Sequence, residues 1–357
     1  TLLPEDEWDF SEDHMILNND FGADTVSGGD FLVAASYLLS WKGPVREEDD
    51  PYNDGATDTS LTAAKHVQEI RFLENRNFTQ IKNMVFKYGA VETSLFISVE
   101  NDSYVSTEFY NPYEYAYCYT GSEDANHEVV IIGWDDNFPA DAFYSDVEGD
   151  GAFICKNSWG ENFGDGGIFY VSYSDTVVGS VSAAYARIED PDNYDNIYQY
   201  DYAGWGGSIG YGRNKAYMAN VFTAGSSQEL KAAGFYAVGR NTAYKIYACR
   251  DYLTSRDLSP AINSGEIIAE GVFEDSGFYT VDFSKAVSVD EGERFAVIVE
   301  ISTQGTGKPV AIEGYSEPDE ITASGESYLS SDGSLWENTQ SSNNCTICLK
   351  VYSDEQR

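Results

Sequence analysis

The chain has 357 residues, and its 21 Lys+Arg against 60 Asp+Glu give a formal net charge of -39. A surface this acidic repels nucleic-acid phosphates and anionic lipid headgroups, so both are unfavourable partners. The 42% hydrophobic and 15% aromatic content predicts a folded protein, and the length suffices for two domains. No apolar stretch reaches the roughly 18 residues of a transmembrane segment. The first ten residues have neither a basic segment nor a hydrophobic signal core, so we expect any export signal to lie upstream.

The first third of the chain is predicted to be helical. The stretch SGGDFLVAASYLLSWKGPV, residues 27–45, is apolar at helical spacing and stops near Gly43 and Pro44. The stretch NFTQIKNMVFKYGAV, residues 77–91, predicts a second amphipathic helix that ends at Gly89. The acidic run at 46–54 between them is interpreted as a solvated turn.

After this region the pattern changes to strands. Short runs of β-branched and aromatic residues, bounded by Gly, Asp or Asn, occur at 90–99, 127–136, 151–159 and 166–174. A helical segment followed by strands is typical of an α+β domain. Polar and turn-forming residues at 187–201 indicate a boundary, and we expect one domain at 1–188 and another at 196–357.

The second half of the chain has almost no helical periodicity. It predicts a β-sandwich, because strand-like runs recur with turn signals between them. These runs lie at 220–224, 230–238, 243–249, 277–283, 294–301, 309–315 and 346–353.

The five cysteines are too few and too scattered for a disulfide framework. They are Cys118, Cys155, Cys249, Cys345 and Cys348. The last two form a lone CxxC, which without a second pair is weak support for zinc or redox chemistry. We interpret them as small hydrophobic residues on strands.

Two motifs 30 residues apart carry the candidate chemistry. DANHEVVIIGWDD, residues 124–136, places His127 at the entry to an apolar strand, and KNSWGENFGDGG, residues 156–167, contains Asn157 and Trp159. An imidazole that takes a thiol proton needs a third side chain to fix its tautomer, and Asn157 can serve as that side chain. An indole beside the Asn–His hydrogen bond excludes water from it. We therefore predict His127 and Asn157 as catalytic residues and Trp159 as their support.

These motifs resemble those of the papain family of cysteine proteases, and the resemblance covers roughly residues 5–185. FSEDHMI at 10–16 is similar to the segment after the family's nucleophile helix, and VSGGDFLVAASYL at 26–38 to its glycine pair and following helix. The resemblance implies an α+β papain-like fold whose N-terminal part is missing. It also implies that Gly28 and Gly29 bind the backbone of an extended peptide substrate; a plain helix-start turn is the alternative.

The stretch from 194 to 224 is similar to the lectin-like domain that follows the papain-like domain in clostridial cell-wall cysteine proteases. This agrees with an all-β sandwich (lectin-like) domain. Its aromatic side chains are open to two interpretations, stacking on a sugar or packing inside the protein. They are Tyr198, Tyr200, Trp205 and Tyr211.

The family's nucleophilic cysteine has no counterpart at the expected place, near or before Thr1. Cys118, in a tyrosine-rich loop, and Cys155, within a strand, lack the helix that lowers a thiol pKa. We expect the chain to begin after the nucleophile helix. Three causes stay open: a truncated or incompletely recorded sequence, proteolytic nicking with an N-terminal fragment lost or unseen, or a degenerate enzyme.

The sequence therefore predicts a papain-type cysteine endopeptidase, bacterial and extracellular or at the cell surface, that is inactive as this chain. The expected partners are a protein or peptide substrate, an N-terminal fragment of the same protein, and a cell-wall or surface-protein contact through the sandwich. Covalent thiol chemistry calls for no cofactor; structural calcium is left open without assigned ligands. The alternative is an inactive papain-like scaffold with a surface- or glycan-binding sandwich.

Overall fold

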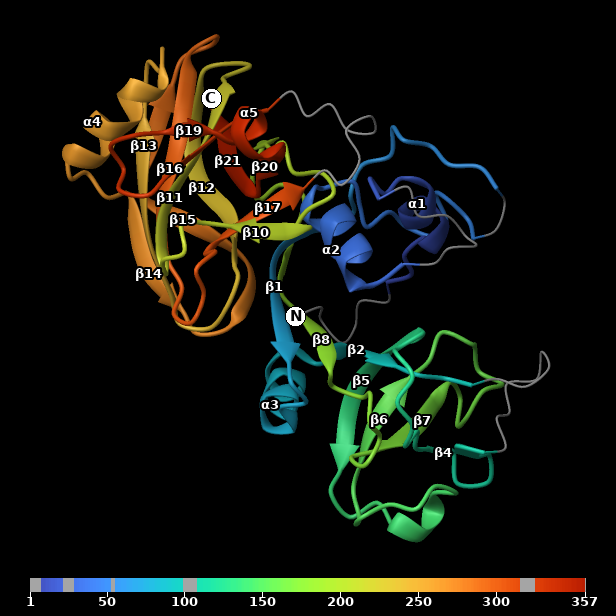
Figure 1. Cartoon of the computed structure of the whole chain (residues 1–357). Coiled ribbons are helices and arrows are strands. Elements are labelled where there is room, and N and C mark those ends of the chain that lie inside the picture. Colours follow the sequence, from blue (N-terminus) through green and yellow to red (C-terminus); the bar gives the residue numbers. More distant parts are fainter. Residues whose placement is uncertain (1–7, 22–28, 53–54, 99–107, 315–324, 357) are drawn as a thin grey trace. The chain divides into compact units, whose positions relative to one another are not determined.

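The computed structural model of the chain (Figure 1) describes residues 8–21, 29–52, 55–98, 108–314 and 325–356. The chain packs into two compact units. One consists chiefly of Arg71–Ala186, and the other combines Leu2–Ile70 with Arg187–Arg357. The boundary between two domains expected at 188–196 was inferred from sequence patterns, whereas these units are defined by packing. The predicted domain boundary therefore stays a prediction.

The unit of residues 71–186 is a β-sheet with one helix. Helix α3 (Phe78–Tyr88) packs on strands β2 and β5, and the strands run in the order β3-β4-β7-β6-β5-β2-β8. Neighbouring strands are antiparallel, except that β4 is parallel to β7. The bounds are β2 (Val91–Leu95), β3 (Tyr110–Asn111), β4 (Ala116–Tyr117), β5 (His127–Asp135), β6 (Ala152–Lys156), β7 (Ile168–Ser172), β8 (Val181–Glu189), and the 3-10 turn η1 (Ala140–Ala142).

Local sequence explains helix α3. The Asn77 side chain accepts a hydrogen bond from the Gln80 amide and caps the N-terminus, and Gly89 ends the helix with a φ of 93° that disfavours other residues. Ile81 and Val85 are buried against the sheet. The helix expected at 77–91 is thus confirmed. This face closes the core of the unit, in which Phe153 is fully buried.

The second unit contains α1 (Glu12–Leu17), α2 (Phe31–Leu39) and the first residues of β1 (His66–Glu74), followed by the sandwich strands. Asp30 caps α2 by accepting from the Leu32 amide, which confirms the helix expected at 27–45. The remaining bounds are β9 (Asn196–Tyr198), β10 (Gly207–Ile209), β11 (Lys215–Thr223), β12 (Gln228–Ala237), β13 (Thr242–Cys249), η2 (Ser255–Asp257), α4 (Leu258–Asn263), β14 (Ala269–Phe273), β15 (Ser276–Val289), β16 (Arg294–Ser302), β17 (Val310–Gly314), β18 (Glu326–Ser330), β19 (Glu337–Asn338), α5 (Thr339–Asn343), β20 (Cys345–Ile347) and β21 (Leu349–Glu355).

The strands of this unit form the predicted sandwich. The order β15-β12-β21-β9 makes one layer, β14-β13-β16-β11-β18-β19 makes the other, and β10-β17-β20 forms a small third sheet. The core between the layers is fully buried and includes Phe235, Phe295 and Leu349. All seven strand-like runs expected in this half lie on observed strands. The short helices α4 and α5 were not expected.

Residues 8–70 pack directly on residues 187–356 within this unit. The Trp41 ring lies 5.3 Å from the Tyr352 ring, measured between centroids. Asn193 Oδ1 lies 2.7 Å from His66 Nδ1, and Lys65 forms an ion pair with Asp190. Helices α1 and α2 and the sandwich therefore belong to one packed unit.

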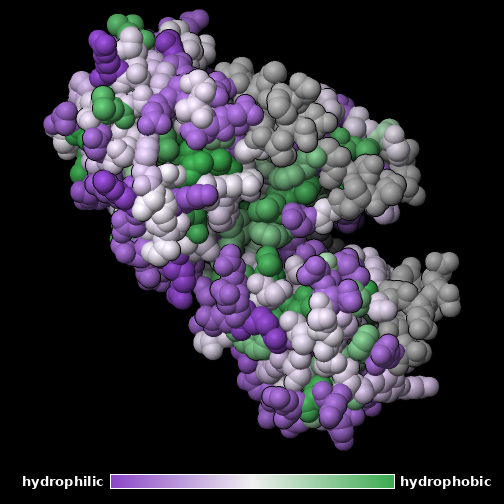
Figure 2. All heavy atoms as spheres, viewed as in Figure 1, coloured by the Kyte–Doolittle hydropathy of each residue, from purple (hydrophilic) through white to green (hydrophobic). Residues whose placement is uncertain are grey.

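The face of the molecule shown in Figure 2 carries many hydrophilic side chains, with hydrophobic side chains gathered on part of it. In the part of the chain that the structure describes, no helix combines the length and apolar character needed to cross a bilayer.

Candidate active site

Strand pairing brings His127 and Asn157 together. His127 is the first residue of β5 and pairs with Leu95 of β2, and Asn157 directly follows the last residue of β6. Strands β5 and β6 are antiparallel, with Val130 opposite Lys156. The end of β6 therefore returns to the start of β5, which places two residues 30 positions apart within contact distance.

The hydrogen bond between them defines the protonation of the imidazole. His127 Nε2 lies 2.8 Å from Asn157 Oδ1, and the same oxygen accepts from the Ser158 amide at 2.8 Å. Because a backbone N–H can only donate, this atom of Asn157 is the oxygen. Nε2 must then carry the proton that it donates, and in the neutral ring Nδ1 holds the lone pair. The geometry therefore gives an imidazole whose Nδ1 accepts a proton.

Trp159 covers this pair. Its ring centroid lies 4.9 Å from that of His127, with 40° between the planes, and Phe163 meets the indole edge-to-face at 5.1 Å. His127 is half-buried, and Asn157 is buried. Burial lowers the pKa of His127 below 6.5, while the hydrogen bond to Asn157 opposes this effect. At neutral pH the ring is therefore mainly uncharged.

The loop from 157 to 167 depends on glycine. The Asn157 amide donates to Gly167 O at 2.9 Å and closes the loop. Gly164 has a φ of 61°, and a Cβ there would lie 2.1 Å from the carbonyl oxygen of Ile168. Larger residues do not fit at Gly164, which explains the glycine-rich sequence after the Asn-Ser-Trp motif.

Asn126 is a positioning residue to which the sequence analysis assigned no role. Its side chain accepts from the Ile97 amide at 2.7 Å and donates to the Ile97 carbonyl at 2.9 Å. It imitates a strand backbone and extends the β2–β5 pairing by one position, immediately before His127. The only sign of this role in the sequence was an asparagine directly before the predicted strand. Its partner 29 residues away was not visible in the sequence.

All five cysteines are buried free thiols. Burial raises the pKa of Cys118 to about 12, and it also raises the pKa of Cys155. A protonated thiol is a poor nucleophile. Cys345 and Cys348 of the CxxC are also buried. The structure thus places none of these thiols in an environment that activates it.

The predicted glycine pair is described only in part, because Gly28 lies outside the described residues. Gly29 directly precedes the α2 cap Asp30 and belongs to the unit that does not contain His127. Its role in substrate binding stays a prediction.

The four aromatic residues of the lectin-like region are half-buried, and Tyr198, Tyr200 and Tyr211 pack against the sandwich core. Tyr198 meets Phe295 edge-to-face at 5.2 Å, and Tyr200 stacks on Phe222 at 4.7 Å. Trp205 contacts the fully buried Tyr236. These contacts support the packing interpretation of the aromatic residues.

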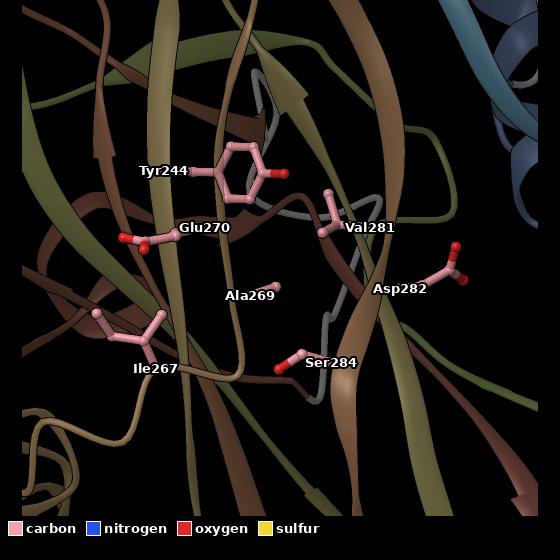
Figure 3. Close-up of a pocket in the computed structure, with 7 residues that line it drawn as sticks. All are labelled: Tyr244, Ile267, Ala269, Glu270, Val281, Asp282 and Ser284. Carbon is pink, nitrogen blue, oxygen red and sulfur yellow. The ribbon is translucent and has the colours of Figure 1, made fainter.

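A pocket of about 410 Å³ lies between β13, β14 and β15 of the sandwich (Figure 3). Tyr244 and Ser284 contribute hydroxyl groups, and Val281 is among its aliphatic lining residues. Figure 3 shows the carboxylates of Glu270 and Asp282 pointing away from it. Among the described residues no group of three or more His, Cys, Asp or Glu side chains is arranged to hold a metal ion.

Comparison with known proteins identifies the class to which this fold and site belong. Residues 3–188 match the papain family of cysteine proteases, and residues 197–353 match the lectin-like domain family. Because the first match covers more than half of the chain, the chain belongs to the papain family of cysteine proteases. The predicted fold, a papain-like domain followed by a lectin-like β domain, is confirmed.

Two solved structures show both domains together. A structure of the clostridial cysteine protease Cwp84 after propeptide cleavage is 25% identical, with a TM-score of 0.84, over 98% of this chain and 89% of that chain. The cysteine protease and lectin-like domains of Cwp84, a surface layer associated protein of Clostridium difficile, are 26% identical, with a TM-score of 0.82, over 99% of this chain and 80% of that chain.

A curated relative matches part of the chain. Cysteine proteinase 2 of Entamoeba histolytica is 26% identical over 168 residues, which cover 44% of this chain and 47% of that protein. The chain thus spans about half the length of this relative.

Proposed function

We propose that the chain is part of a papain-type cysteine endopeptidase, in which His127 is the general base and Asn157 its orienting residue. The observation that carries this proposal is the Nε2–Asn157 hydrogen bond, which leaves Nδ1 as the proton acceptor. Membership of the papain family supports it. The nucleophile would come from a cysteine outside these 357 residues, so this chain by itself would be inactive.

The proposed mechanism needs only thiol, imidazole and water. His127 Nδ1 takes the proton from the thiol, and the thiolate sulfur attacks the carbonyl carbon of the peptide bond. The C–N bond breaks as the imidazolium returns the proton to the leaving amine, and an acyl thioester forms. Water then hydrolyses the thioester and restores the thiol. Asn157 would hold the ring in position throughout, and neither metal nor cofactor takes part.

We further propose protein substrates outside the cell or at a bacterial cell surface. The support is the similarity over nearly the whole chain to Cwp84, which is described as a surface layer associated protein. The net charge of -39 is compatible with a cation-rich exterior that screens repulsion.

The test is peptide hydrolysis by a polypeptide extended upstream by the sequence its gene encodes. We expect thiol-dependent activity that is abolished by His127→Ala. Asn157→Ala is expected to lower kcat/KM by roughly 10- to 100-fold, because one orienting hydrogen bond is lost. Glu270→Gln, an exposed substitution in the sandwich, serves as the control. Full activity of the His127→Ala variant would overturn the proposal.

A further inference from the structure

Three ionisable side chains are buried together in the unit that contains the sandwich. Asp201, Glu313 and Lys350 expose 0%, 4% and 1% of their surface. They come from the segment after β9, from β17 and from β21. Charged groups are costly to bury unless they are paired, so this cluster needs an explanation.

Lys350 pairs with Asp201, one of the two acids. Its Nζ forms an ion pair with Asp201 Oδ2 at 3.1 Å, and it donates to Asp201 O at 3.2 Å and to Gln199 Oε1 at 2.8 Å. An ammonium group has three protons, and three partners surround this one. Lys350 therefore compensates the charge of Asp201 and holds residues 199–201.

Glu313 has no such cation. Its Oε2 accepts from the Ala203 amide at 2.9 Å, and this one bond lowers the pKa of Glu313 without supplying a counter-charge. Two carboxyl groups and one ammonium leave one uncompensated negative charge unless a proton stays bound. Burial, followed by the charge of Asp201, raises the pKa of Glu313 to about 7.

Burial also raises the pKa of Asp201, but the ion pair with Lys350 opposes that effect, so we assign the proton to Glu313 rather than to Asp201. Asp201, Tyr202, Cys348 and Asp20 are acidic groups from neighbouring segments, and Lys350 is the cation. Lys42, which lies over the Tyr202 ring, is paired with Asp20 at 2.6 Å. Among these described groups none offers Glu313 a second counter-charge.

The segment held by this cluster touches helix α2. Gln199 Nε2 donates to Ser40 O, at the C-terminal cap of α2, at 3.0 Å. Gly204 lies so close to Ser36 that a Cβ at position 204 would be 3.1 Å from the Ser36 Cβ. The carbonyl of Gly204 also accepts from Cys348 Sγ at 3.4 Å. Residues 199–206 thus connect the sandwich to α2.

We propose that Asp201, Glu313 and Lys350 form a proton-dependent latch that holds residues 199–206 against α2. When Glu313 is protonated, the cluster is electrically balanced and the segment is closed. When Glu313 ionises, its charge faces Asp201 in a buried site, and the segment opens more often. The latch does not depend on the proposed catalysis, and it needs no residue outside this chain.

The direction of the effect follows from linkage. An acid whose pKa rises from 4.5 in the open state to about 7 in the closed state retains a proton on closing. Closure is therefore favoured at low pH, and it weakens as the pH rises from about 4.5 to about 7. The opening equilibrium is expected to increase by up to roughly 70-fold between about pH 5 and about pH 8.

The experiment is hydrogen exchange of the whole chain, read by mass spectrometry at about pH 5 and about pH 8 and corrected for the intrinsic pH dependence of exchange. We expect protection of residues 199–206, including the Ala203 amide, to fall at the higher pH. Glu313→Gln keeps an acceptor for the Ala203 amide but has no titrating proton. In this variant the protection of residues 199–206 should be high at both pH values. Glu270→Gln, which removes an exposed carboxylate of the same unit, should behave as the unmodified chain.

Two results would overturn the latch. One is a change in protection of less than about threefold in the unmodified chain. The other is a Glu313→Gln protein that retains the full pH dependence. The comparison of the unmodified chain at the two pH values needs no variant, so the proposal stays testable even if Glu313→Gln does not fold.

Discussion

His127 Nε2 donates its proton to Asn157 Oδ1 across 2.8 Å, and that oxygen is identified by the Ser158 amide that also donates to it. This relationship between the two side chains fixes the tautomer of the imidazole. It gives Nδ1 the lone pair that a general base requires. The predictions about the site depend on this arrangement.

The first prediction concerns the titration of His127. Burial lowers its pKa below 6.5, so the NMR titration midpoint of its ring protons is expected below that value. Between the folded pKa and 6.5 the unfolded state binds more protons, so stability rises with pH in this window. His127→Gln should reduce that slope in chemical denaturation. A midpoint above 6.5 in the isolated chain would contradict the assignment.

The second prediction concerns Trp159. Trp159→Ala removes a half-buried indole that contacts both His127 and Phe163. We expect a loss of roughly 2 kcal/mol in the free energy of unfolding, about half the cost at a fully buried site. Water would also reach the imidazole, so the pKa of His127 should move toward 6.5. Trp159→Phe should retain much of the stability. An unchanged His127 titration in the alanine variant would show that the indole does not shield it.

The third prediction concerns the thiols of this chain. All five are buried, and burial raises the pKa of Cys118 to about 12. We expect negligible modification of the native chain by an alkylating reagent that modifies all five cysteines after denaturation. Cys118→Ser should leave the activity of the upstream-extended polypeptide unchanged. Rapid native labelling of Cys118 would show that it is an activated thiol.

The fourth prediction concerns the buried ion pair. Lys350→Met removes the cation that lies 3.1 Å from Asp201 and leaves a buried carboxylate unpaired. The expected loss is about 3–5 kcal/mol in the free energy of unfolding at neutral pH. Lys350→Met combined with Asp201→Asn should recover part of this loss. The contrary result, a single variant as stable as the unmodified chain, would mean that Asp201 is neutral in the native state.

The sequence predicted those features that depend on local patterns. His127, Asn157 and Trp159 could be singled out because two compact motifs flank neighbouring strands, and the structure places the three side chains together; their catalytic roles stay a prediction. Strand β8 was missed, because its alanines have little strand preference. The cluster of Asp201, Glu313 and Lys350 was also missed. Asp201 lies more than a hundred residues before Glu313 and Lys350, and in the sequence all three resemble ordinary surface charges.

The most direct test of the central claim is the reaction of the upstream-extended polypeptide with an irreversible peptidyl thiol inhibitor, followed by intact mass and peptide mapping. The account predicts a single label, on a cysteine outside these 357 residues, and loss of labelling in His127→Ala. Labelling of Cys118 or Cys155 instead, or labelling that is unaffected by His127→Ala, would contradict it.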